Sequence, residues 1–321
     1  MFAAYAATTD PAEPLSALRV GDIAPPPAPD GWVGVTVKAA TLNRHDLWSL
    51  AGVGLAADSC PMILGCDAAG IDDDGNEVIV HSVIGDPEAG GGDETLDPRR
   101  TLLSEKYPGA LAERVWVPAR NLVAKPASLS FPEAACLPTA YLTAFRMLTT
   151  RGRLPSDGSV LIQGATGGVS TAAILIARAL GARVYVTSRS EAGRESASEL
   201  GATAVETGAR LPERVDVVIE SVGAATIEHS LKCAKPGGRI VVCGSTSGHM
   251  ATVDLRRLFF LQLELVGSTM GTIEELRRLT QMVAMSEVRP LIDSTFSLAD
   301  AADAFARLDS GDIFGKIVVE P

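Results

Sequence analysis

The sequence has few of the features that mark membrane proteins, nucleic-acid-binding proteins or disulfide-linked folds. No run of about 18 apolar residues occurs, so no membrane-spanning helix is expected. Acidic residues outnumber basic ones by 39 to 28, and the formal net charge of −11 argues against a nucleic-acid partner. A local basic pocket for a single small phosphate remains compatible with this charge.

Cysteines are scarce and scattered. The chain has five, with no CxxC pair: Cys60, Cys66, Cys136, Cys233 and Cys243. Neither a disulfide framework nor a four-cysteine zinc site is expected from this pattern. Residues 1–10 lack the basic start and apolar core of a secretion signal, so the reducing cytoplasm is the expected location.

The length of 321 residues predicts two domains, because single cores rarely grow beyond about 250–300 residues. The first 50 residues suggest strands and turns. The Gly- and Pro-rich, acidic segment Gly85–Pro98 is predicted to be a solvated surface loop. A helix is expected from Phe131, with Ser130 as its cap and Pro132 in its first turn.

Strands then alternate with single helices, which predicts right-handed crossovers and a parallel, doubly wound sheet. Two helices end at glycines, Gly181 and Gly201. The expected strands are Val160–Gln163, Arg183–Thr187, Asp216–Glu220, Arg239–Cys243 and Leu261–Val266. The expected helices are Val169–Leu180, Glu191–Leu200, Ala225–Ala234 and Ile273–Ser286. The tail is predicted to add a strand, a short helix (Leu298–Leu308) and a closing strand (Lys316–Glu320).

A glycine-rich turn follows the strand Val160–Gln163 and opens the next helix. Glycines in such a turn let the backbone approach a pyrophosphate at the helix N-terminus. The turn therefore predicts dinucleotide binding, although Ala165 and Ser170 replace the outer glycines of the usual pattern. The candidate contacts are Ala165, Thr166, Gly167, Gly168 and Val169.

The end of the second strand of this alternation indicates which nicotinamide cofactor fits. An acidic residue there would bind a ribose 2′-hydroxyl, but Ser188 and Arg189 occupy the position. A serine hydroxyl and a guanidinium suit a 2′-phosphate, which predicts NADPH. Arg194 is a weaker candidate for the same phosphate. The alternative is that Arg189 is a solvated surface charge and Glu191 binds the ribose of NAD.

The sequence resembles the medium-chain dehydrogenase/reductase superfamily, in its zinc-free, quinone-oxidoreductase-like branch, nearly from end to end. Besides the glycine-rich turn, the resemblance rests on Leu42–Trp48, Ile63–Gly70, Pro108–Glu113, Tyr141–Ala144, Lys235–Arg239, Gly267–Gly271 and Phe314–Ile317. It implies an α/β protein in which a GroES-like β-barrel catalytic domain (1–123 and 272–321) surrounds a Rossmann nucleotide-binding domain (124–271). It also implies a homodimer, for which the strand Leu261–Val266 could pair across a two-fold axis.

No metal is expected. Zinc-dependent relatives carry Cys at the position of Asn43 and Gly-His-Glu at the position of Gly65, Cys66 and Asp67. Catalytic zinc needs three protein ligands around an open position, and this pattern does not supply them. Alkoxide stabilisation by a metal is then missing, so reduction of an electron-poor acceptor is the easier chemistry.

Site roles follow mainly from the resemblance. Asn43 would bond near the nicotinamide ribose or the substrate oxygen, or else stabilise a turn. Asp46 would orient that region or relay a proton, or else cap a helix. Thr143 matches the nicotinamide-contacting threonine of the family. Residues at strand ends or matching late-chain cofactor contacts are Val222, Gly223, Gly244, Ser245, Thr246, Thr269, Phe314 and Lys316.

The predicted activity is hydride transfer from NADPH to a quinone or an activated C=C of a small molecule, without a metal. Trp48 and Tyr107 would line the substrate pocket, although aromatic side chains more often serve packing. The alternatives are an enoyl-thioester or aldehyde reductase of the same superfamily, or a catalytically idle NADPH-binding protein. His229 and His249 are expected at the surface, without partners.

Overall fold

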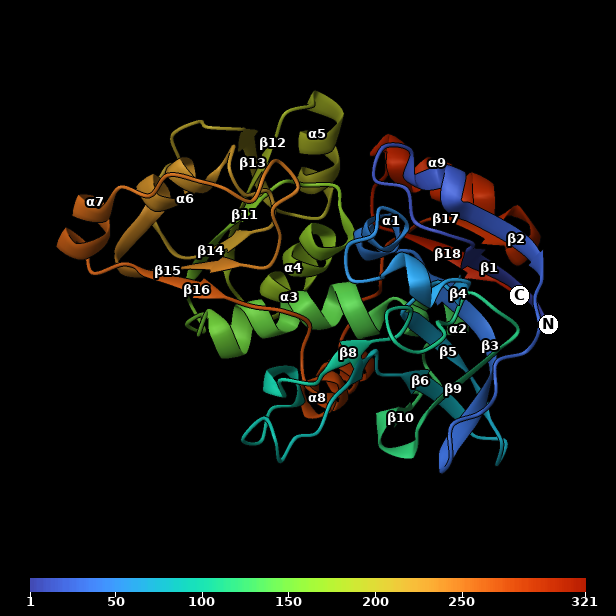
Figure 1. Ribbon diagram of the computed structural model, residues 1–321. Coiled ribbons are helices and arrows are strands. Elements are labelled where there is room, and N and C mark those ends of the chain that lie inside the picture. Colours follow the sequence, from blue (N-terminus) through green and yellow to red (C-terminus); the bar gives the residue numbers. More distant parts are fainter. The chain divides into compact units, whose positions relative to one another are not determined.

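The computed structural model describes residues 1–321 and divides into two compact units (Figure 1). Unit 1 comprises residues 1–140 and 270–321, and unit 2 comprises residues 141–269. The sequence placed the first boundary earlier, after residue 123. Residues 131–140 belong to unit 1 because they bond to it: Thr41 donates to the carbonyl of Ala135 and Thr139 donates to Asp67.

Unit 1 is built mainly of β-sheet, in accordance with the predicted GroES-like domain. Its strands are β1 (Phe2–Ala6), β2 (Leu18–Asp22), β3 (Trp32–Thr41), β4 (Met62–Ile63), β5 (Asp67–Asp72), β6 (Glu77–Val80), β7 (Val83–Ile84), β8 (Thr101–Leu102), β9 (Arg114–Pro118), β10 (Leu122–Ala124), β17 (Ile292–Ser297) and β18 (Lys316–Glu320). Its helices are α1 (Arg44–Leu50), α2 (Phe131–Ala135), α8 (Ile273–Met285) and α9 (Ala301–Ser310).

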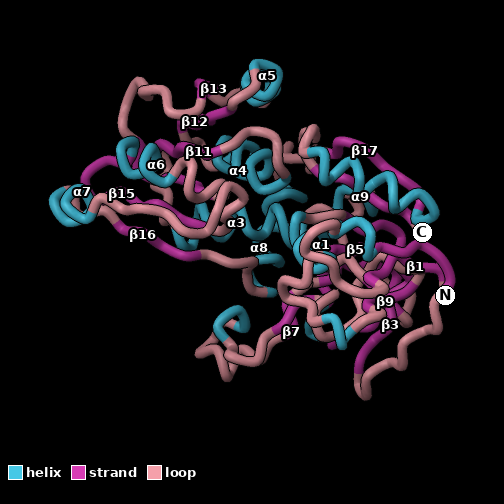
Figure 2. The backbone as a smooth tube through the Cα atoms, turned by 45° about the horizontal axis from the view of Figure 1, so that its top comes forward, coloured by secondary structure: helices cyan, strands magenta, loops and turns pink.

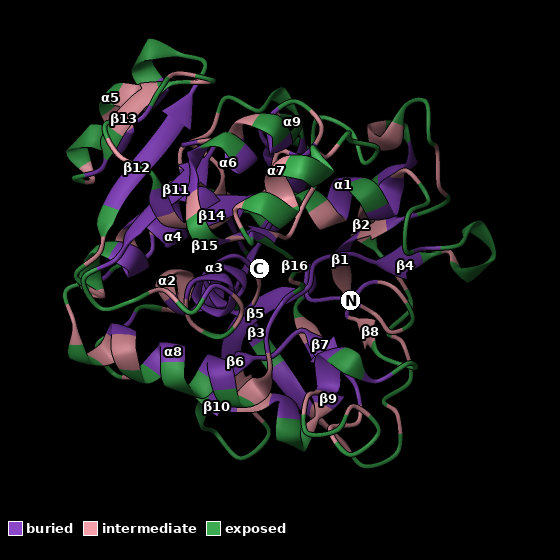
Figure 3. Ribbon diagram, turned by 90° about the vertical axis from the view of Figure 1, so that its left-hand side faces the viewer, coloured by how far each residue is buried: buried purple, intermediate pink, exposed green.

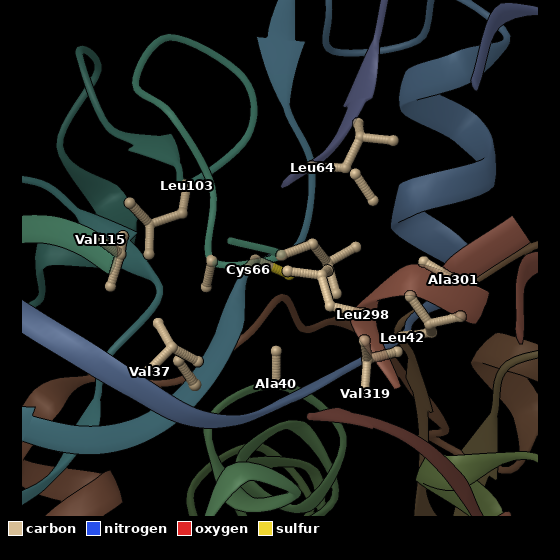
Figure 4. Close-up of a cluster of buried hydrophobic side chains, with 14 of the residues drawn as sticks. Val37, Ala40, Leu42, Leu64, Cys66, Leu103, Val115, Leu298, Ala301 and Val319 are labelled. Carbon is tan, nitrogen blue, oxygen red and sulfur yellow. The ribbon is translucent and has the colours of Figure 1, made fainter. Parts of the chain in front are cut away.

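The largest sheet of unit 1 joins both ends of the sequence. Its strand order is β10-β6-β5-β3-β18-β17, with β9 also paired to β3. The late strand β18 lies antiparallel to β3, so Lys316 at its start is brought beside the turn that follows β3. Apolar side chains from early and late segments share one core, including Leu42, Cys66 and Leu298 (Figure 4).

Unit 2 has the predicted parallel, doubly wound sheet. The strands are β11 (Ser159–Gln163), β12 (Arg183–Ser188), β13 (Thr203–Glu206), β14 (Val215–Glu220), β15 (Ala234–Val242) and β16 (Glu264–Gly267), and their order is β13-β12-β11-β14-β15-β16. The helices are α3 (Leu142–Arg146), α4 (Gly168–Ala179), α5 (Glu191–Glu199), α6 (Ile227–Cys233) and α7 (Leu255–Phe260). This is the strand order of dinucleotide-binding Rossmann domains, in which ligands bind at the carboxyl ends of the strands.

The central strands of unit 2 are almost entirely buried, as their continuous apolar sequences suggest (Figure 3). By contrast, α7 is exposed and stands at the margin of its unit (Figure 2). The sequence did not predict α7. The following strand begins at Glu264 instead of Leu261, because residues 261–263 close the helix: the N–H of Leu261 bonds the carbonyl of Arg257, and Gln262 has a φ of 53°.

Two other regions differ from the sequence-based expectations. The first 50 residues include the helix α1 as well as strands and turns. The segment Gly85–Pro98 is not wholly a solvated loop, because Glu94 is buried. Its carboxylate lies 3.4 Å from the buried His81 and accepts the N–H of Ile273 at the start of α8. The loop is thereby tied to two distant elements of unit 1.

None of the helices combines the length and the apolar character that a membrane span requires.

Candidate active site

Unit 1 contains a buried polar cluster centred on Asp67, the first residue of β5. This carboxylate is fully buried and accepts hydrogen bonds from Thr41 Oγ1 (2.8 Å), Thr139 Oγ1 (2.5 Å) and Asn43 Nδ2 (2.8 Å). Burying an anion is unfavourable unless its oxygens are paired, and here several donors converge on it. The donors come from β3, the turn after it, and the helical segment after α2.

Lys316 places a second buried charge in this cluster. Its Nζ donates to the carbonyl of Leu42 (2.7 Å) and to Asn43 Oδ1 (2.6 Å), and it lies 3.4 Å from Asp67 Oδ2. Only 3% of the residue is exposed. The ammonium group is therefore engaged inside unit 1, and its predicted contact with a cofactor stays a prediction.

Asp46 organises the backbone beside this cluster. Its carboxylate accepts the N–H of Asn43 (2.7 Å) and the N–H of Gly65 (3.0 Å). Burial raises the pKa of this carboxyl above its ordinary value. The two bonds fix the N-terminus of α1 against the turn before β5, so Asp46 orients the segment that carries Asn43.

Trp48 and Tyr107, which were predicted to line the substrate pocket, lie on α1 and in the segment between β8 and β9. Trp48 is 46% exposed on α1. Tyr107 packs against Trp32 at the end of β3 opposite to Asn43, with ring centroids 4.7 Å apart and the ring planes tilted by 54°. The backbone N–H of Phe314 bonds the carboxylate of Asp293. The roles of Trp48 and Tyr107 beside a substrate, and of Phe314 beside the cofactor, stay predictions.

In unit 2 the glycine-rich turn meets the end of β12. Gly164 has a φ of 85°, a left-handed conformation that favours glycine, and α4 begins at Gly168. The glycine-rich turn and the end of β12 both lie close to Gly193, where an added Cβ would lie 2.6 Å from Ser188 Oγ and 3.3 Å from Thr166 Cγ2. Thr166 and Ser188, two of the predicted cofactor contacts, therefore come together at the start of α5.

Two arginines flank Ser188. Arg189 is exposed and its guanidinium makes no ion pair, while Arg194 donates to the carbonyl of Ser188 at 3.1 Å. Glu191, the acidic alternative for a ribose, is exposed in the first turn of α5. Ser188 itself is buried, and its register partner on β13 is Glu206.

The loops after β14 and β15 are bonded to each other. The N–H and Oγ of Ser247 both donate to the carbonyl of Val222, and the N–H of Ala224 donates to the carbonyl of Gly248. A Cβ on Gly223 would lie 2.8 Å from Ser245 Cα. The structure thereby brings together the predicted cofactor residues Val222, Gly223, Gly244, Ser245 and Thr246.

The two predicted threonine contacts lie elsewhere in unit 2. Thr143 is buried in α3, and Thr269 is exposed after β16. Sequence reasoning did not assign roles to Asp67, Thr41 or Thr139. Asp67 stood in a motif compared with metal ligands, but its partners are spread over the sequence and become visible only in the fold.

Comparison with known families agrees with both units. The alcohol dehydrogenase GroES-like domain matches residues 29–127, and the zinc-binding dehydrogenase domain matches residues 168–285. The 2-methylene-furan-3-one reductase of Solanum lycopersicum is 32% identical over 94% of this chain and 74% of its own length. The chain belongs to the medium-chain dehydrogenase/reductase superfamily.

Two further relatives illustrate the range of this family. A phenolphthiocerol/phthiocerol polyketide synthase polypeptide of Mycobacterium tuberculosis is 31% identical over 95% of this chain, which spans only 14% of that polypeptide. A crotonyl-CoA carboxylase/reductase, AntE V350A, solved in complex with NADP, superposes with a TM-score of 0.88 at 25% identity, covering 99% of this chain and 94% of that one.

The residues at the family's zinc position do not fit zinc. Asn43 and Cys66 occupy it, and burial together with Asp67 and Asp46 raises the pKa of the Cys66 thiol well above its ordinary value. A thiol must lose its proton to bind zinc, and the raised pKa of Cys66 opposes this. At the other position, Asn43 Oδ1 already accepts a hydrogen bond from the Lys316 ammonium at 2.6 Å. No group of three or more His, Cys, Asp or Glu residues in the chain is arranged to hold a metal ion.

Proposed function

We propose that this protein is an NADPH-dependent reductase of activated C=C bonds, those conjugated to a carbonyl group. The observation that carries the proposal is the meeting of Thr166, Ser188 and two arginines at the start of α5. This arrangement offers hydroxyl and guanidinium donors to a 2′-phosphate, and the last residue of β12 is a serine instead of an acidic residue.

The cofactor would lie along the carboxyl edge of the unit 2 sheet. The N-terminus of α4 suits the pyrophosphate, and Ser188 with Arg189 suits the 2′-phosphate. The bonded loops at Val222 and Ser245 form the continuation of the same edge. When bound, NADPH supplies a hydride, and with a proton from solvent the C=C acceptor becomes a saturated C–C bond.

The substrate class follows from the zinc position and from the relatives. A cluster holding Lys316 in place of metal ligands offers no Lewis acid for an alcohol, so an acceptor that is already electron-poor is favoured. The tomato relative is named for an enone, and the solved relative for an enoyl thioester. Quinones remain a candidate class that these relatives do not represent.

The cofactor test is the substitution Arg189→Ala. Because only NADPH carries the 2′-phosphate, the dissociation constant for NADPH should rise about tenfold while that for NADH stays nearly constant. Lys232→Ala, which removes an exposed cation on α6, is the matched control and should change neither. Equal loss of both cofactors in Arg189→Ala would contradict the assignment.

The substrate test is NADPH oxidation over a panel of enones, enoyl thioesters, quinones and aldehydes. The proposal expects turnover with enones or enoyl thioesters, and metal analysis of the active protein should find no stoichiometric zinc. Tight NADPH binding with no turnover of any acceptor would instead favour the second candidate, an idle cofactor-binding protein.

We further propose a homodimer formed through β16 and located in the cytoplasm. The strand lies at the edge of the sheet, Leu265 on it is 45% exposed, and Phe259 and Phe260 of the neighbouring α7 are 69% and 77% exposed. Leu265→Lys should yield a monomer by analytical ultracentrifugation; an unchanged mass would contradict this interface. The five cysteines are unpaired, which suits a reducing compartment.

A further inference from the structure

A chain of buried side chains crosses the carboxyl ends of β12, β11 and β14, below the proposed cofactor edge. Gln163, the last residue of β11, is fully buried at its centre. The N–H of Gly164 donates to Thr187 Oγ1 (3.3 Å), and this hydroxyl donates to Gln163 Oε1 (2.7 Å). The glycine-rich turn is thus bonded, through one side chain, to the end of the neighbouring strand.

On its other side Gln163 bonds α6. Its Nε2 donates to Ser230 Oγ (3.0 Å) and to His229 Nδ1 (2.9 Å). The Ser230 hydroxyl then donates to Glu220 Oε2 (2.6 Å). All three strands involved are buried along this edge (Figure 3).

Glu220 connects these side chains to the loop after β14. Its Oε1 accepts the N–H of Val222 (2.8 Å) and the N–H of Gly223 (2.9 Å), and Thr226 Oγ1 completes its partners at the start of α6. The carboxylate therefore determines the path of the same loop that bonds to Ser247 and Gly248.

His229 extends the chain to the segment between β13 and β14. Its Nε2 lies 2.8 Å from the carbonyl of Ala209. A carbonyl only accepts, so Nε2 donates to it, and Nδ1 accepts from Gln163. Cys233 Sγ also lies 3.3 Å from Nε2, and with Nε2 as the donor the sulfur accepts.

We propose that Gln163 and His229 are positioning residues for the cofactor. Through them the glycine-rich turn, the end of β12, the loop after β14 and the segment at Ala209 are held in one arrangement before the cofactor arrives. Such preorganisation strengthens binding because fewer groups must be ordered on association. The inference rests on the proposed NADPH binding.

The first test is Gln163→Met, which keeps the length of the side chain and removes all of its hydrogen bonds. The control is Ser159→Ala, which removes a hydrogen bond to Asp216 Oδ2 (2.9 Å) at the opposite end of the same strand. We expect Gln163→Met to raise the dissociation constant for NADPH, measured by fluorescence titration, about tenfold. Ser159→Ala should stay within about twofold of wild type, although it lowers the thermal midpoint.

The second test uses His229 and the probe adenosine 2′,5′-bisphosphate. His229→Leu removes the bond to Ala209 and should weaken binding of this probe, by isothermal titration, about fivefold. His229→Gln keeps an acceptor for Gln163 and a donor for the carbonyl, so it should restore affinity. Because His229 is only half-buried, its variants are expected to fold and can test the proposal even if Gln163→Met does not fold.

The outcomes separate the two proposals. If the wild-type protein binds neither NADPH nor the probe, the proposed function is wrong and this inference falls with it. If the wild type binds and the Gln163 and His229 variants bind equally well, only this inference is overturned. It is also overturned if each variant, including Ser159→Ala, loses affinity in proportion to its lowered thermal midpoint, because the network would then be merely structural.

Discussion

Replacing Lys316 by Met should be among the most damaging substitutions in unit 1. The methionine would fill the space of the lysine stem, but the ammonium that faces Asp67 would be gone. Asp67 is fully buried, so water could not replace the lost cation without opening the core. Asn43 Oδ1 and the carbonyl of Leu42 would lose their donor in the same step.

The expected loss is about 3–5 kcal/mol of the free energy of unfolding, the range found when one partner of a buried ion pair is removed. Asp67→Asn should also be destabilising, because it leaves the ammonium without its carboxylate. The double variant has no unpaired buried charge. Its loss should therefore be smaller than the sum of the two single losses, by at least about 1 kcal/mol.

The assay can report unit 1 alone, because all three tryptophans, Trp32, Trp48 and Trp116, belong to it. Urea unfolding followed by tryptophan fluorescence would give the three free-energy changes. Lys125→Met is the matched control: its ammonium is also buried, but the carboxylate of its partner Glu77 is 50% exposed and can be hydrated. Additive losses, or a control variant as damaging as Lys316→Met, would refute the reasoning.

Three other predictions follow from local geometry. Burial opposes ionisation of Asp293, but hydrogen bonds from the Arg307 guanidinium and a backbone N–H outweigh this effect and lower the pKa of the carboxyl below 3.8. The ionised carboxylate therefore stabilises the fold above pH 3.8, and this contribution is lost as the pH falls through the folded pKa. Asp293→Asn should lower the thermal midpoint at pH 7 but much less once the pH is below the folded pKa, which itself lies under 3.8; an equal difference at both would contradict this. Burial raises the pKa of both the Cys60 and the Cys66 thiols, but that of the buried Cys66 stands well above its ordinary value. Iodoacetamide at pH 8 should therefore label Cys60 before Cys66 by mass spectrometry, and early labelling of Cys66 would argue against it. Gly193→Ala forces a Cβ toward Ser188 Oγ and should lower stability by about 1–3 kcal/mol and weaken NADPH binding by calorimetry; unchanged affinity would contradict the placement.

The sheet of unit 2 could be predicted because its signals are local. β11, β12 and β14 are short apolar runs, and two of the helices end at the glycines Gly181 and Gly201. The sequence did not predict β13, which has the residues TAVE and no buried residue. The glycine-rich turn and Ser188 lie at strand ends, so a parallel sheet alone brings them to one edge. The handedness of the crossovers determines on which side of the sheet each helix lies, whereas the order β13-β12-β11-β14-β15-β16 comes from the structure.

Residues whose partners are distant in the sequence could not be predicted. His229 was expected at the surface, yet it bonds Gln163, 66 residues earlier, and the carbonyl of Ala209. Glu94 lies in a segment whose composition indicates a solvated loop, yet it is buried because it satisfies an N–H of α8, 179 residues later. Composition reports the average exposure of a segment, whereas a single buried carboxylate depends on which donor the fold brings to it.

The residues at the family's zinc position show most clearly that contacts between distant residues cannot be predicted from the sequence. An amide at position 43 and a cysteine at position 66 indicate only that two metal ligands are missing. The structure shows that Lys316 lies between the residues of this cluster, 273 positions after Asn43 in the sequence. The Asn43 amide accepts from Lys316, donates one N–H to Asp67, and directs Nδ2 toward the Cys66 sulfur at 3.7 Å. An amide has two N–H donors and two lone pairs on its oxygen, so little capacity remains for a ligand. In this fold Asn43 therefore bonds both buried charges, and its bond to the nicotinamide ribose or the substrate oxygen stays a prediction.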